Sequence, residues 1–149
     1  FLNFGKIDLT ECVDKKLKTK YAQLVKNTID NRGDIFGHFD HISIEVQMIA
    51  KMKTVATAFQ CFFWGKSHLI SPLALRRHFN ISTGNYRNNK QASIKMIPKL
   101  PISQANIDLF NSYPANKKDD VADAMLIALY HAQKMEEPPK RPRKRRKKK

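Results

Sequence analysis

The segment that most restricts the fold is KKDDVADAMLIALYH, residues 117–131. The helix predicted over Asp119–Lys134 is apolar on most of its sides, so other elements must cover it from more than one direction. Three aspartates, Asp119, Asp120 and Asp123, nevertheless lie in or just after its first turn. The sequence therefore predicts a layered domain in which a buried helix carries carboxylates at its start.

Short strands alternate with helices along the chain, and this alternation predicts an α/β fold. The polar segment NISTGNYRNNK, Asn80–Lys90, is predicted to be a loop. One domain is expected over residues 1–137, followed by a disordered basic tail at residues 138–149. The predicted strands are Phe1–Thr10, His41–Val46 and Ser67–Ser71, and the other predicted helices are Lys16–Asn31, Ala50–Trp64, Leu73–Phe79, Gln91–Ile97 and Ala105–Asn111.

The charge of the chain indicates a polyanionic partner. The net charge is +15, and nine of the positive residues lie in the tail PPKRPRKRRKKK, so +6 remains on the body. A basic body with a basic tail favours nucleic acid over a small metabolite as the partner. The tail is expected either to clamp DNA phosphates or to act as a localisation signal.

The cysteines and histidines suggest neither a disulfide framework nor a zinc site. Cys12 and Cys61 are the two cysteines, which favours a reducing, intracellular compartment. His38 and His41 have metal-like spacing, but no Cys or His partners follow at zinc-site intervals, so ordinary surface or half-buried histidines are expected. No segment is long and apolar enough to predict a membrane span.

The carboxylates of the buried helix suggest a metal site. Asp119 and Asp120 suit a helix start, where a carboxylate caps free N–H groups. Asp120 and Asp123 share a face and repel each other unless a cation joins them, and Mg²⁺ or Mn²⁺ prefers such ligands. Glu45, in the strand ISIEVQ, would by itself be expected to face solvent. Beside the two aspartates it becomes a candidate third ligand, because acidic clusters with two metal ions hydrolyse phosphodiesters.

Five motifs in order resemble the RuvC-like Holliday junction resolvases, and most closely the branch of poxviruses and other large DNA viruses, which is related to the mitochondrial resolvases. These motifs are ISIEVQ, AKMK, the SP after a strand, TGNYRNNKQ and DDVADA, and the resemblance runs from about Phe1 to His131. It implies a ribonuclease H-like fold with a mixed central sheet flanked by helices. It also implies a homodimer that cuts opposed strands of four-way DNA junctions, leaving 5′-phosphates, in the host cytoplasm or nucleus if the protein is viral.

The resemblance assigns roles to individual residues. Glu45, Asp120 and Asp123 match the metal ligands, for two Mg²⁺ or Mn²⁺ ions per site, and Lys90 matches a lysine that stabilises the scissile phosphate. A solvated loop charge is the simpler interpretation of Lys90. Asp119 and Gln47 are expected beside the ligands rather than among them. The residues expected to contact DNA are Lys51, Lys53, Arg87, Lys90, Lys117 and Lys118.

The resemblance also implies a first strand with a catalytic aspartate, in a motif like DIGxKN. Phe1–Thr10 resembles later strands, and Asp8 lies on the wrong one, so the chain is expected to be N-terminally incomplete. Two further functions stay open. One is a catalytically impaired, structure-specific DNA-binding protein of the same fold, and the other is a ribonuclease H-like nuclease that acts on RNA/DNA hybrids.

The helix predicted to run to Trp64 has more apolar surface than one sheet face needs. In the resolvases the equivalent helix forms much of the dimer contact, so the resemblance implies an isologous homodimer through residues 51–64. A plain core helix is the alternative.

Overall fold

The computed structural model describes residues 7, 9 and 20–136. These residues form a mostly helical α/β structure with a small parallel sheet of two strands, β1 (Ile42–Glu45) and β2 (Ser67–Ile70). The predicted α/β class and these two predicted strands are thereby confirmed. Nearly all of the strand predicted at Phe1–Thr10, and the whole tail at residues 138–149, lie outside the described residues.

A single helix, α3 (Ala50–Phe62), connects the two parallel strands. Side chains alternate between the two faces of a strand, so Ser43 and Glu45 share one face of β1. Ser43 pairs with His68 in the register of the sheet, and Glu45 pairs with Ile70. One face of the sheet therefore carries the polar side chains of Ser43, Glu45 and His68.

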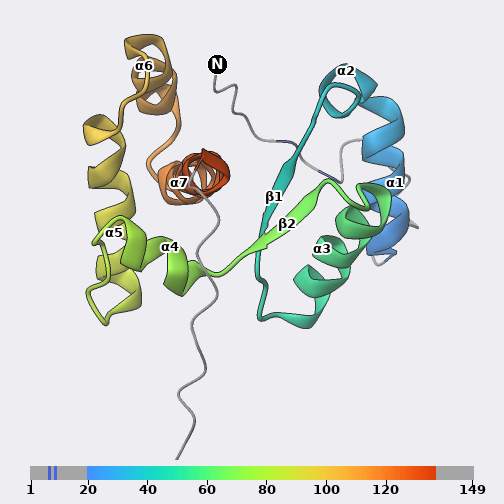
Figure 1. Cartoon of the computed structure of the whole chain (residues 1–149), viewed down its shortest axis with the longest axis horizontal. Coiled ribbons are helices and arrows are strands. Elements are labelled where there is room, and N and C mark those ends of the chain that lie inside the picture. The colour runs from blue at the N-terminus through green and yellow to red at the C-terminus, as the bar shows by residue number, and fades with distance from the viewer. Residues whose placement is uncertain (1–6, 8, 10–19, 137–149) are drawn as a thin grey trace, which may run out of the picture.

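The helices divide into two groups on either side of the strands (Figure 1). One group consists of α1 (Tyr21–Asn31), α2 (Gly33–Phe36) and α3, with α1 packed on α3. The predicted stop at Asn31 is correct for α1, although the chain re-enters a helix at Gly33. The other group consists of α4 (Pro72–His78), α5 (Tyr86–Met96), the 3-10 turn η2 (Ile97–Lys99), α6 (Gln104–Ser112) and α7 (Lys118–Glu136).

The main hydrophobic core lies in the second group and is built around α7. Ala122 and Leu126 have no exposed surface, which confirms the prediction that this helix is buried. Apolar residues from several elements surround it, so α7 is fixed firmly in place. The buried members of this core are Ile70, Leu75, Ile81, Ile97, Leu100, Phe110, Val121, Ala122, Met125, Leu126 and Ile127.

The prediction of a loop over Asn80–Lys90 is wrong in its second half, because α5 begins at Tyr86. The side chain of Asn85 accepts hydrogen bonds from the backbone N–H groups of Arg87, at 2.9 Å, and Asn88. This cap satisfies N–H groups that a helix start leaves free, so a polar, Asn-rich segment begins a helix. Arg87 and Lys90 consequently lie on a helix rather than on a loop.

The turn before α5 is fixed by a buried amide. Gly84 adopts φ +73°, a conformation that a side chain would strain. The Asn89 Oδ1 atom accepts hydrogen bonds from both the backbone N–H and the hydroxyl of Thr83, each at 2.8 Å. The start of α5 is therefore held in a defined position relative to the preceding turn.

The inner face of α3 packs as an ordinary core helix. Ala56 and Ala58 are buried, and the rings of Phe59 and Phe63 each lie 5.9 Å from the ring of Phe36. Part of the apolar surface that suggested a dimer contact is therefore used within the chain.

The ends of α3 and its flanking residues leave other apolar side chains exposed. Met48 is 82% exposed, Trp64 is 86% exposed, and Phe62 is also exposed. The homodimer through residues 51–64 stays a prediction. Among the helices of the described residues, none has the length and apolar character needed to cross a membrane.

Candidate active site

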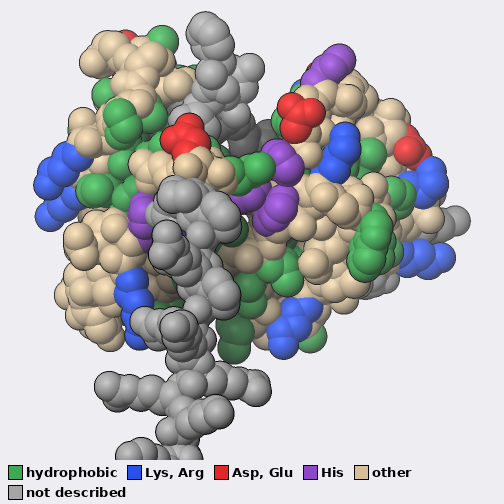
Figure 2. All heavy atoms as spheres, in the orientation of Figure 1, with side chains coloured by type: hydrophobic (Ala, Val, Ile, Leu, Met, Phe, Trp, Pro, Cys, Tyr) green, Lys and Arg blue, Asp and Glu red, His purple; other side chains and the backbone are tan. Residues whose placement is uncertain are grey.

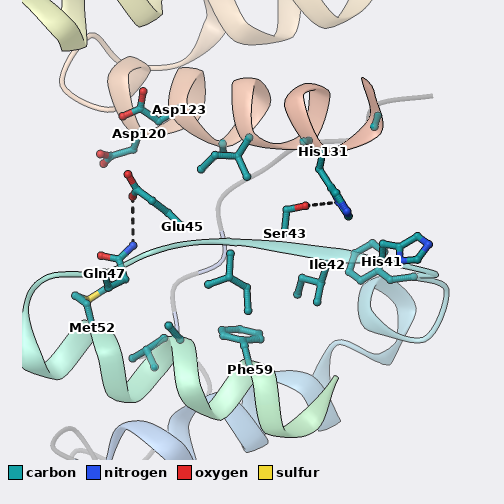
Figure 3. A pocket seen from close by; sticks show the side chains of 18 of the residues that line it. His41, Ile42, Ser43, Glu45, Gln47, Met52, Phe59, Asp120, Asp123 and His131 are labelled. Atoms are coloured by element: carbon teal, nitrogen blue, oxygen red, sulfur yellow. Dashed lines mark hydrogen bonds between the residues drawn. The ribbon is translucent and has the colours of Figure 1, made fainter. Parts of the chain in front are cut away.

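A pocket of about 690 Å³ lies between α7, β1 and α3 (Figure 3). One end is acidic, the other end carries imidazole and hydroxyl groups, and the α3 side is apolar. The side chains that define these three parts are Glu45, Asp120 and Asp123, then His41, Ser43 and His131, then Met52, Val55 and Phe59.

The structure brings the three predicted carboxylates to the same end of this pocket. Glu45 projects from β1 toward α7, and Asp120 and Asp123 lie on the first turns of α7 at that same end of the pocket (Figure 3). Glu45 and Asp123 are half-buried, whereas Asp120 is exposed. The alternation in ISIEVQ places Ser43 and Glu45 on one face of β1. That face is the one that meets α7.

The electrostatics of Glu45 reflect this crowding. Burial raises the pKa of the Glu45 carboxyl, and the negative charges of Asp123 and Asp120 raise it further. Two groups oppose these effects. The Gln47 amide donates a hydrogen bond to Glu45 at 3.3 Å, and the charge of Arg76 also lowers the Glu45 pKa. Gln47 therefore lies beside the carboxylates, as predicted.

Asp123 shows the same conflict between burial and charge. Burial raises the pKa of its carboxyl, while interaction with the Ser93 side chain and the positive charges of Arg76 and Lys90 lower it. The groups that lower the Asp123 pKa therefore do not outweigh the effect of its burial.

Arg76 acts electrostatically on the acidic end of the pocket, and no sequence pattern pointed to it. It is half-buried on α4, which packs on α7, and its charge acts on both Glu45 and Asp123. The sequence offers two adjacent arginines, and Arg77 is the exposed one. The burial of Leu75 fixes the orientation of α4, and only the packed structure distinguishes the two arginines.

Lys90 forms an ion pair with Asp119. The two side chains are 28% and 18% exposed. The hydrogen bond from Lys90 lowers the pKa of the Asp119 carboxyl, and the same bond raises the pKa of Lys90 above its usual range. The Lys90 ammonium also lies 5.2 Å from the centroid of the Tyr86 ring. Asp119 is therefore more than a helix cap, since it holds Lys90 beside the acidic end of the pocket.

The donor set of this pocket suits a hard divalent cation in its chemistry, because all three predicted ligands are carboxylates. Their arrangement is looser than that of a finished metal centre. Among residues 20–136, no group of three or more His, Cys, Asp or Glu side chains is arranged to hold a metal ion.

The other basic residues predicted to contact DNA are spread over both helix groups. Lys51 and Lys53 are exposed on α3, and Arg87 is exposed in the first turn of α5. Lys117 and Lys118 are half-buried where α7 begins. Figure 2 shows Lys and Arg side chains in several separate places on the face that it displays, rather than in one continuous patch.

A histidine cluster that was not predicted lies at the opposite end of the pocket, where His41 and His131 line the pocket and His68 packs against both without lining it. The Ser43 hydroxyl and the His131 Nδ1 atom are 2.7 Å apart. His41 Nδ1 lies 3.1 Å from His68 Nε2, and the rings of His68 and His131 have centroids 4.2 Å apart. Burial, together with the neighbouring His68 and His41, lowers the pKa of His131. The alternation in HISIE, which places His41, Ser43 and Glu45 on one face, was the available signal.

Comparisons with protein-family models, with curated proteins and with solved structures find no match to this chain.

Proposed function

We propose that this protein is a metal-dependent, structure-specific endonuclease of the RuvC-like type that resolves four-way (Holliday) DNA junctions by symmetric phosphodiester hydrolysis. The observation that carries the proposal is the meeting of Glu45 from β1 with Asp120 and Asp123 from α7 in one pocket. The net charge of +15 supports a nucleic-acid substrate. The proposal includes a ribonuclease H-like fold, which extends beyond the two-stranded sheet described above.

In this proposal Glu45, Asp120 and Asp123 would hold the Mg²⁺ or Mn²⁺ ions. Bound there, two such ions would supply Lewis-acid activation of water and stabilisation of the leaving oxygen. The protein's own positive groups neutralise charge on the phosphate: Lys90 remains oriented by Asp119, and Arg76 faces the carboxylates from α4. Gln47 keeps the Glu45 carboxylate oriented through its hydrogen bond.

The remaining basic residues contact the DNA backbone, which fixes the position of the substrate without reading its sequence. A homodimer through residues 51–64 places two equal sites about a two-fold axis, and this symmetry matches a four-way junction. The exposed Met48, Phe62 and Trp64 around α3 supply apolar surface for such a contact.

The decisive experiment measures cleavage of a four-way junction, a plain duplex and an RNA/DNA hybrid, each with Mg²⁺, Mn²⁺ or EDTA. We expect metal-dependent, symmetric cleavage of the junction. The variant Asp123→Asn should lower the cleavage rate by about 10²–10³-fold or more, while junction binding remains. Asp108→Asn is the matched control, because Asp108 is an exposed aspartate on α6, outside the pocket lining.

Full cleavage by a folded Asp123→Asn protein would refute the assignment of the site. Preferred cleavage of the hybrid would instead identify a ribonuclease H-like enzyme with another substrate.

A second candidate function is a structure-specific DNA-binding protein that cuts weakly or not at all. It is favoured by the lack of any three-residue metal-holding group among the described residues. The same assay separates the two functions. Tight junction binding without cleavage in either metal, and without any change of affinity in Asp123→Asn, would favour the binding protein.

A further inference from the structure

At and beside the imidazole end of the pocket, histidines from three parts of the chain meet. His41 directly precedes β1, His68 lies on β2, and His131 lies on α7. The parallel register pairs Ser43 with His68, so both side chains lie on the face of the sheet that meets α7. His41 is two residues before Ser43 and shares that face. Figure 3 shows His41, Ser43 and His131 at the end of the pocket away from the carboxylates.

We propose that His41 and His68 form a binding site for one divalent transition-metal ion of the Zn²⁺ class. The facing atoms, His41 Nδ1 and His68 Nε2, are 3.1 Å apart. Two imidazole nitrogens on one tetrahedral zinc, each about 2.0–2.1 Å from the metal, lie about 3.3 Å from each other. Small rotations of the two rings therefore suffice to admit an ion between them.

The site takes two protein ligands, and water completes the coordination. No three His, Cys, Asp or Glu side chains of the described residues are arranged to hold a metal ion, so His131 is not a third ligand in this arrangement. Its Nδ1 atom is already engaged by the Ser43 hydroxyl at 2.7 Å. His131 instead packs against His68 and limits the motion of that ring.

Metal binding requires a lone pair on both facing nitrogens, His41 Nδ1 and His68 Nε2. The imidazole tautomer that carries its proton on the other ring nitrogen supplies that lone pair, so each ring can act as a ligand through the facing atom. No oxidant or further reactant is required.

The His41–His68 pair differs in chemistry from the acidic end of the pocket. Imidazole nitrogen favours Zn²⁺, Ni²⁺ and Cu²⁺, whereas carboxylate oxygen favours Mg²⁺ and Mn²⁺. The two ends therefore select different ions, and the proposal of a histidine site does not depend on nuclease activity.

The test is calorimetric titration of untagged, metal-stripped full-length protein with Zn²⁺ in the presence of excess Mg²⁺. We expect one Zn²⁺ per chain, and a loss of affinity of about tenfold or more in His68→Gln and in His41→Gln. His41 is exposed, so His41→Gln tests the site even if His68→Gln folds poorly. The exposed His38 supplies the matched control, His38→Gln, which should bind Zn²⁺ like the wild type.

The double variant Glu45→Gln/Asp123→Asn should also keep its Zn²⁺ affinity. Zn²⁺ binding that is lost in that double variant, or kept in both His41→Gln and His68→Gln, would overturn the proposal. So would the absence of any Zn²⁺ binding by the wild type.

Discussion

The two helix groups differ in how well their apolar side chains are covered. The group α4–α7 shares one continuous core with Ile70, and Leu126 at its centre has no exposed surface. The group α1–α3 has a smaller buried set around Leu24 and Val25, and Met48 and Trp64 stand in solvent beside it. Asp120 and Asp123 lie on α7 in the well-packed group, whereas Glu45 lies on β1 between the two groups. The well-packed group therefore fixes Asp123, while the position of Glu45 depends on the contacts of β1 with β2 and α7.

The largest expected effect tests where the stability of the fold resides. Leu126→Ala deletes a fully buried side chain in the main core and should lower the free energy of unfolding by about 2–5 kcal/mol. Leu109→Ala is the control, because Leu109 is exposed on α6 and its truncation should stay within about 0.5 kcal/mol. Urea denaturation measures both values. Equal losses for the two variants would contradict the assignment of the core.

A smaller loss in the free energy of unfolding is expected from a truncation in the group α1–α3. Val25→Ala removes two buried carbons from the contact of α1 with α3 and should cost about 1–2 kcal/mol. Hydrogen exchange of the variant should show faster opening of α1 and α3 than of α7, because the main core is left intact. If hydrogen exchange in α7 became as fast as in α1 and α3, the two helix groups would unfold as one unit. The proposed difference in stability between them would then be wrong.

The hydrogen bond that joins β1 to α7 is expected to contribute less to the free energy of unfolding than either hydrophobic core. Ser43→Ala removes the hydrogen bond to His131 and should cost about 1 kcal/mol. Ser112→Ala is a suitable control, because the Ser112 hydroxyl donates only to the nearby Leu109 carbonyl. Thermal melts compare the two variants, and a smaller loss for Ser43→Ala than for Ser112→Ala would show that the link contributes little.

The smallest expected effect is a gain of stability, not a loss. Burial raises the folded-state pKa of Asp123 above its ordinary value of 3.8, so the ionised carboxylate destabilises the fold at neutral pH. Asp123→Asn should therefore raise the melting temperature in EDTA at pH 7. As the pH falls through the folded pKa toward 3.8, wild-type Asp123 becomes protonated and the advantage of the variant should disappear. A lower melting temperature for the variant at pH 7 would contradict this electrostatic account.

Local periodicity was enough to predict much of the fold. The alternation in HISIEV predicted β1, and apolar spacing predicted α3 and α7 within a few residues of their observed ends. The start of α5 was missed because Asn and Gly usually indicate a loop. Here the Asn85 side chain caps a helix instead. The ribonuclease H-like fold remains a prediction, since the two-stranded sheet does not distinguish it from other α/β folds.

The sequence predicted those parts of the candidate site whose residues share a single helix or strand, or belong to one sequence motif. The spacing of Asp120 and Asp123 gave one face of a helix, and the alternation around Glu45 gave one face of a strand. Arg76, the pairing of Lys90 with Asp119, and the meeting of His68 with His131 arise from packing between distant segments. No local pattern encodes such contacts, so they required the structure.

The separation of Ser43 and His131 by 88 positions has a consequence for biosynthesis. A ribosome that adds roughly 5–20 residues per second needs ~4–18 s to make the chain between them. During that interval β1 can already pair with β2, whereas the partners that α7 supplies for Glu45 and Ser43 have not yet been made. The acidic end of the pocket is therefore assembled only after α7 has been translated, and a nascent chain that stops short of α7 lacks Asp120, Asp123 and His131.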